Sequence, residues 1–131
     1  MENASTNIEL PPFFRGVKLV IGSNNFLREQ LSTLNETETV NQITDDYLQS
    51  TRALTIHVGN GESVIFLKYP NLNPRDISTI AHEATHAALF LLKAVDIKTN
   101  KHTEELLAYL IEYITFRILK FIEDMNHEVE P

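Results

Sequence analysis

Two histidines and a glutamate in the second half of the chain have the spacing of a metal site with its own base. They lie in the stretch STIAHEATHAALFLL, where His82 and His86 are four positions apart and Glu83 follows the first histidine. On a helix, side chains at i and i+4 lie one above the other on the same face. Both imidazoles can then bind one ion about 2 Å away, with Glu83 one step around the helix, where a general base can act on metal-activated water. The pattern H-E-x-x-H therefore predicts a zinc site with hydrolytic chemistry.

A third ligand must be a carboxylate or an imidazole, because the chain contains no cysteine. It does not follow on the same helix, since leucines occupy the positions where the metzincin pattern has glycine and histidine. A second helical segment begins near Glu104 and Glu105, and either carboxylate can reach a metal. We favour Glu105, because Ala108 three residues later is small and allows close approach of the helices, whereas Leu107 follows Glu104 at that spacing. Two histidines and one carboxylate leave a fourth position for water, as in catalytic zinc sites.

Together these motifs resemble the gluzincin zinc peptidases. HEATH at 82–86 is followed after a short connection by EELLAY at 104–109. An E-x-x-A-Y pattern after H-E-x-x-H is similar to the very small members that phages and prophages encode, and the likeness covers about residues 63–115. The resemblance implies a metalloprotease that acts on peptide or protein substrates, with Glu83 as the base and Zn²⁺ bound by three residues: His82, His86 and Glu105.

The resemblance also implies features of the substrate site. In the family an edge strand pairs with extended peptide, and residues 63–69 are expected to form that strand here. Larger gluzincins use a His or Tyr from a second domain to stabilise the tetrahedral intermediate. No second domain fits in this chain, so the resemblance leaves Tyr109 or His57 for that role, although alternation along its strand predicts that His57 faces solvent.

The same residues also have structural explanations that need no metal. His82, Glu83 and His86 can form a polar stripe on the solvent face of an amphipathic helix. The helix dipole favours acidic residues such as Glu104 and Glu105 in a first turn. A second class of function therefore stays open: a non-catalytic binding protein that zinc stabilises and whose apolar last helix contacts a partner.

Capping residues and hydrophobic periodicity predict the elements that position these residues. Asn73 and Pro74 begin a helix whose apolar spacing continues to Val95. A further helix begins near Asn100 or Thr103 and continues to about residue 125, with apolar residues on nearly all sides. Upstream, the patterns predict strands at 17–21, 53–58 and 63–69, a short helix at 26–34, and a loop at 32–46 with a short strand near 40–43.

These elements predict a single α+β domain over residues 1–131, in which a small antiparallel or mixed sheet packs on two long antiparallel helices. Residues 1–12, which end in two prolines, are expected to be a loose arm, and residues 126–131 a tail.

The net charge of −7 and the lack of a basic cluster argue against nucleic acid as a partner. No apolar run approaches the length of a membrane span and the start does not have a signal-peptide pattern, so we expect a cytoplasmic protein without a membrane partner. The apolar last helix makes a homo-oligomer an open expectation.

Overall fold

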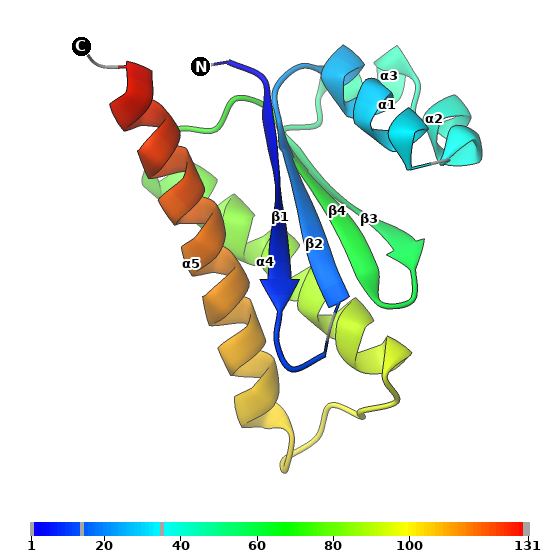
Figure 1. Ribbon diagram of the computed structural model, residues 1–131, viewed down its shortest axis with the longest axis vertical. Helices are drawn as coiled ribbons and strands as arrows, with labels where there is room; N and C mark the ends of the chain where they lie inside the picture. Colours follow the sequence, from blue (N-terminus) through cyan, green and yellow to red (C-terminus); the bar gives the residue numbers. More distant parts are fainter. Residues whose placement is uncertain (1, 14, 35, 130–131) are drawn as a thin grey trace.

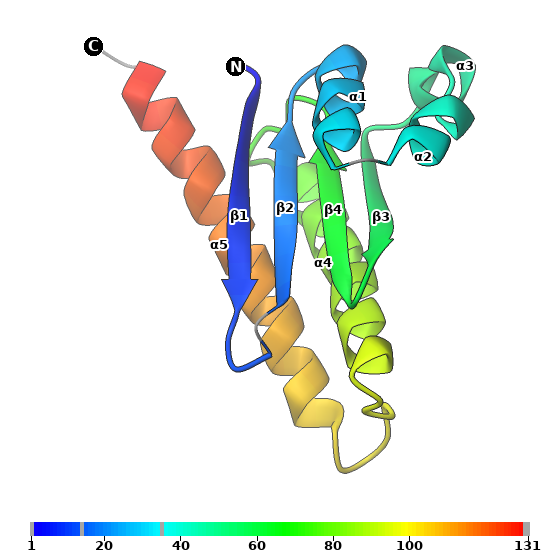
Figure 2. The same cartoon turned by 45° about the vertical axis from the view of Figure 1, so that its right-hand side comes forward.

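A four-stranded mixed sheet forms the centre of the fold. The computed structural model describes residues 2–13, 15–34 and 36–129. The strands lie in the order β1 (Ala4–Leu10), β2 (Arg15–Ile21), β4 (Glu62–Leu67) and β3 (Ala53–Gly59), as Figure 2 shows. The β2 and β4 strands pair in parallel, whereas β1 with β2 and β3 with β4 are antiparallel. The fold therefore belongs to the predicted α+β class, with a mixed sheet.

Two layers of helices cover the sheet. The short helices α1 (Asn24–Thr33), α2 (Thr37–Gln42) and α3 (Asp45–Gln49) lie over one face, and the long helices α4 (Pro74–Ala94) and α5 (Glu104–Val129) lie over the other (Figure 1). A short connection joins α4 to α5, which run in opposite directions. Among the described residues, no helix combines the length and the apolar character that crossing a bilayer requires.

Alternation along the strands divides the core into two parts. In β2, Leu19 and Ile21 pack with α4 and α5, while Val20 between them packs with α1 and α3 on the other face. Because both faces are covered, β4 has five consecutive buried residues and shows no polar alternation. The parallel β2–β4 pair is thus enclosed between the two helical layers, and the antiparallel strands β1 and β3 form the edges of the sheet.

The start of α4 has the capping that its sequence predicts. The Asn73 side-chain oxygen accepts a hydrogen bond from the Asp76 amide at 2.8 Å, and Pro74 occupies the first turn. Asp76 is 5% exposed and also pairs with Arg52 at 3.2 Å. These contacts fix the beginning of the helix that carries His82 and His86.

The structure corrects four local predictions. The loose arm predicted for residues 1–12 is wrong for residues 4–10, which form the edge strand β1, where Ile8 and Leu10 are buried. The predicted loop at 32–46 contains α2 and the start of α3, and no strand forms at 40–43. The predicted tail begins too early, since α5 continues to Val129; residues 130–131 lie outside the described part of the chain. Residues 63–69 do not form an edge strand, because β4 pairs with a neighbour on each side.

Candidate metal centre

The histidine pair converges as the motif predicts. The Nε2 atoms of His82 and His86 lie 3.1 Å apart, the rings meet edge to face at 82°, and both side chains are exposed on α4. Two nitrogens that bind one zinc ion tetrahedrally at roughly 2.05 Å are separated by about 3.3 Å. The observed separation therefore fits two ligands of one ion, provided that each ring carries its proton on Nδ1 and leaves the Nε2 lone pair free.

Glu83 lies on a different side of α4 from the histidines and is 7% exposed. Its Oε2 accepts a hydrogen bond from the Thr55 hydroxyl at 2.7 Å, and the same hydroxyl oxygen lies 3.2 Å from the Glu83 main-chain carbonyl oxygen. Thr55 belongs to β3, so this contact joins the motif helix to the adjacent edge strand. The carboxylate is thereby held in one orientation at the contact between α4 and β3.

His57 lies beside the same segment of α4. It is two residues after Thr55, so both side chains point to the same face of β3. Its ring stacks on Phe90, one helical turn after His86, with ring centroids 3.9 Å apart. Burial first, and then the positive charges of His86 and Lys93, lower the pKa of His57. The side chain is exposed, as predicted, but one face of its ring packs against the helix.

A buried hydroxyl lies next to His57. Ser63 on β4 is its direct cross-strand partner, so the two side chains share the face of the sheet that α4 covers. Ser63 is 2% exposed, and its Oγ has no hydrogen-bond partner among the described residues. The edge of the sheet thus places Thr55, His57 and Ser63 against the motif helix.

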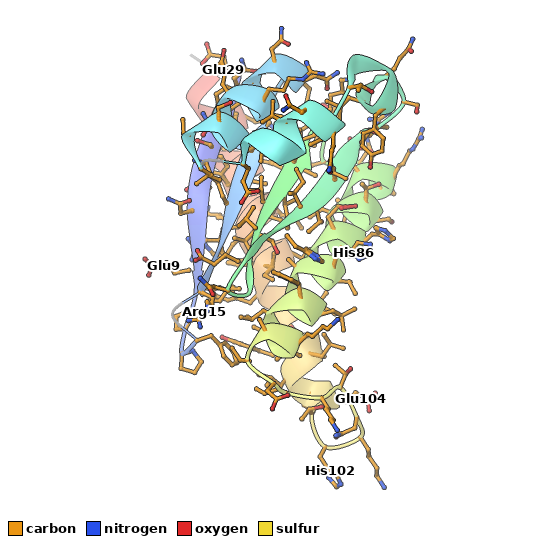
Figure 3. The ribbon with its side chains drawn as sticks, turned by 90° about the vertical axis from the view of Figure 1, so that its right-hand side faces the viewer. Glu9, Arg15, Glu29, His86, His102 and Glu104 are labelled. Atoms are coloured by element: carbon orange, nitrogen blue, oxygen red, sulfur yellow. The ribbon has the colours of Figure 1, made fainter. Side chains whose placement is uncertain are left out.

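The glutamates expected to supply the third ligand lie close to the connection between α4 and α5, away from the histidines. Glu104 and Glu105 form the exposed first turn of α5. In Figure 3, Glu104 lies beyond the end of α4, whereas His86 lies near the middle of that helix. Within residues 2–13, 15–34 and 36–129, no three His, Cys, Asp or Glu side chains are grouped so that they could hold a metal ion. The structure therefore assembles the two histidines and leaves Glu105 apart from them.

Tyr109 is also on α5, where it is 52% exposed and its ring stacks with Tyr113 at a centroid distance of 6.0 Å. The Tyr113 hydroxyl in turn accepts a hydrogen bond from Arg117 at 2.8 Å. His57 and Tyr109 were the two residues considered for stabilising an intermediate. Of these, His57 packs against the segment of α4 that follows His86.

A cavity of about 520 Å³ lies away from the motif. Its lining includes Asn7 of β1, Lys18 of β2 and Val58 of β3, and it contains none of the residues of the H-E-x-x-H motif. The lining also includes Glu9, Arg15 and Glu62, so acidic and basic side chains both border this cavity.

Sequence reasoning did not identify Thr55, Ser63 or the strand that lies beside the motif. The available signal was weak: Thr55 and His57 alternate with apolar residues in ALTIHV, which indicates that they share one face. Which helix covers that face depends on the order of the strands, and strand order has no local signature in the sequence.

Comparisons of the chain with family models, with curated proteins and with solved structures found no match.

Proposed function

We propose that the chain is a zinc-dependent metallohydrolase that cleaves peptide bonds. The observation that carries the proposal is the 3.1 Å approach of the His82 and His86 Nε2 atoms on a well-capped helix. The adjacent Glu83 supports it, because its carboxylate is fixed by Thr55. A bound zinc ion would polarise the scissile carbonyl and make water a better nucleophile.

The residues of the chain take distinct roles in this proposal. His82 and His86 hold the ion, and Glu105 stays the predicted third ligand, which requires the start of α5 to approach the histidines. Glu83 accepts the proton of the attacking water and passes it to the leaving amine. His57 is in a better place than Tyr109 to contact the substrate carbonyl, because it packs on Phe90 beside the histidines.

The substitution Glu83→Gln tests the proposal. Gln cannot accept the proton, but it keeps the size of the side chain, so the variant should bind zinc in the wild-type ratio and lose hydrolysis of a peptide pool. The base normally contributes about 10²- to 10⁴-fold in rate. Zinc content by elemental analysis and peptide products by mass spectrometry provide the two measurements.

The matched control is Glu112→Gln on α5, a neutralised exposed glutamate outside the motif, which should keep both zinc and hydrolysis. The double variant His82→Ala/His86→Ala should lose zinc. Full hydrolysis by Glu83→Gln would contradict the assigned base, and wild-type protein that binds no zinc would contradict the metal site.

Two observations favour a second function, a non-catalytic binding protein that zinc stabilises. The described residues assemble two metal-binding side chains rather than three, and α5 exposes Phe116 at 60% and Tyr109 at 52%. Melting with and without a chelator distinguishes the two functions. A large loss of stability on chelation, together with no cleavage of any peptide, supports the binding protein.

A further inference from the structure

The basic and imidazole side chains of α4 form a single line along the helix. They are Arg75, His82, His86 and Lys93, separated by seven, four and seven residues. At about 100° per residue, these spacings keep all four within a stripe roughly 40° wide. All four are exposed.

The two acidic side chains of α4 point elsewhere and are buried. Asp76 is 5% exposed and pairs with Arg52, and Glu83 is 7% exposed and accepts the Thr55 hydrogen bond. No carboxylate in the described part of the chain forms an ion pair with Arg75 or Lys93. The stripe therefore carries positive charge that no described carboxylate pairs with, although the net charge of the chain is −7.

The stripe runs beside an open edge of the sheet. The β3 strand is the last strand in the sheet order, so its outer edge pairs with no other strand among the described residues. His57 on β3 contacts the α4 segment at Phe90, and the positive charge of Lys93 acts on it. An extended segment that lies along β3 would therefore pass next to the stripe.

We propose that the ligand of this surface is an acidic peptide in extended conformation. The proposal rests on the proposed function, because it takes the histidine pair as the place of the scissile bond. Arg75 and Lys93 are 18 residues apart on α4, about 27 Å along the helix axis, so each lies about 13 Å from the midpoint of the histidine pair. In a strand, about four residues span that distance.

The expected ligand thus has Asp or Glu about four residues before and after the bond at the histidines. An exposed strand edge pairs with peptide backbone rather than with nucleotides, and the overall negative charge disfavours the phosphates of nucleic acid.

Fluorescence anisotropy on zinc-loaded Glu83→Gln protein, which cannot consume its ligand, tests the proposal. The probes are labelled Ala/Gly peptides that have Glu, Gln or Lys about four residues on each side of the centre. The Glu peptide should bind about fivefold more tightly than the Gln peptide, as expected for two exposed ion pairs, and the difference should disappear at high salt.

The charge-reversal variant Arg75→Glu/Lys93→Glu should reverse the order and favour the Lys peptide. The matched control, Lys101→Glu/Lys120→Glu, makes the same change in net charge on the loop and on α5 and should leave the order unchanged. Equal affinity for the Glu and Gln peptides, or an equal effect of both variants, overturns the proposal. Tighter binding of a single-stranded oligonucleotide than of the Glu peptide also overturns it.

The outcome is separable from the fate of the proposed function. If wild-type protein binds zinc but shows no preference for Glu, only the inference about the ligand fails. If it binds no zinc, the proposed function fails, and with it the assignment of the scissile bond to the histidines.

Discussion

His82 and His86 were predictable because four-residue spacing on a helix is a local property. A single turn of α4 brings the two Nε2 atoms to 3.1 Å, whatever surrounds it. The contact between Thr55 and Glu83 was not predictable in the same way, since it joins residues 28 positions apart through the packing of a strand on a helix. The position of the third ligand is equally hard to predict from the sequence, because it depends on which side of α4 the helix α5 packs against.

His57 provides a prediction at the residue scale. Burial and the charges of His86 and Lys93 lower its pKa below the ordinary value of 6.5. The folded state then binds fewer protons than the unfolded state, so this residue favours folding above pH 6.5, and the contribution is lost as the pH falls through the lowered pKa. The substitution Lys93→Met should raise the pKa of His57 but keep it below 6.5, because burial is the larger cause.

Titration of the His57 ring by NMR in metal-free protein measures this pKa. Lys101→Met, which removes a charge from the loop, should leave it unchanged. A wild-type pKa at or above 6.5 would be inconsistent with the packing of His57 on Phe90.

At the scale of elements, α4 was the most predictable part of the fold. Its cap, its proline and its apolar spacing all agree, and the helix ends one residue before the predicted Val95. The β1 strand was missed because Ile8 and Leu10 are the only large apolar residues in ASTNIEL, a pattern typical of an edge strand that is buried on one face. In α3 the cap was present, since the Thr44 hydroxyl accepts from the Tyr47 amide, but the helix is too short to show a hydrophobic period.

The cap of α4 gives a prediction at this scale. Asn73→Ala removes the acceptor of the Asp76 amide and should lower the free energy of unfolding by about 1 kcal/mol. Asn73→Ser keeps a capping oxygen and should be close to wild type. Denaturant unfolding followed by circular dichroism measures both, and equal stability of the Ala and Ser variants would show that Asn73 does not cap the helix.

In the whole molecule, β1 connects the sheet to α5, since Ile8 and Leu10 lie in the same core as Ile114 and Ile118. The β1 strand is therefore part of the core, contrary to the prediction of a loose arm. The order β1-β2-β4-β3 also places β3, rather than β4, at the open edge. Neither property can be obtained from local patterns, because both depend on contacts between distant segments.

Ile8 tests the importance of β1. It is 1% exposed, so Ile8→Ala should lower the free energy of unfolding by about 2–4 kcal/mol, through lost burial and a new void. Asn7→Ala, on the exposed face of the same strand, should change it by less than about 0.5 kcal/mol. Similar effects of the two substitutions in denaturant unfolding would rule out the packing of β1 against α5.

The parallel pairing of β2 with β4 also affects where the chain can change in length. The residues that we assign to the centre and its basic stripe, apart from the predicted Glu105, lie between Thr55 and Lys93. The hairpin and α4 that contain them are formed by a continuous stretch of chain. The segment between β2 and β3 contributes none of these residues and forms a separate layer on the opposite face of the sheet (Figure 1). Insertions at the exposed end of α2, next to Asn41 and Gln42, should therefore leave the centre intact, whereas a deletion that includes the buried Ile43 would disturb the core beneath the short helices. The end of α2 is thus the natural place for added length among descendants of this fold and for attaching labels.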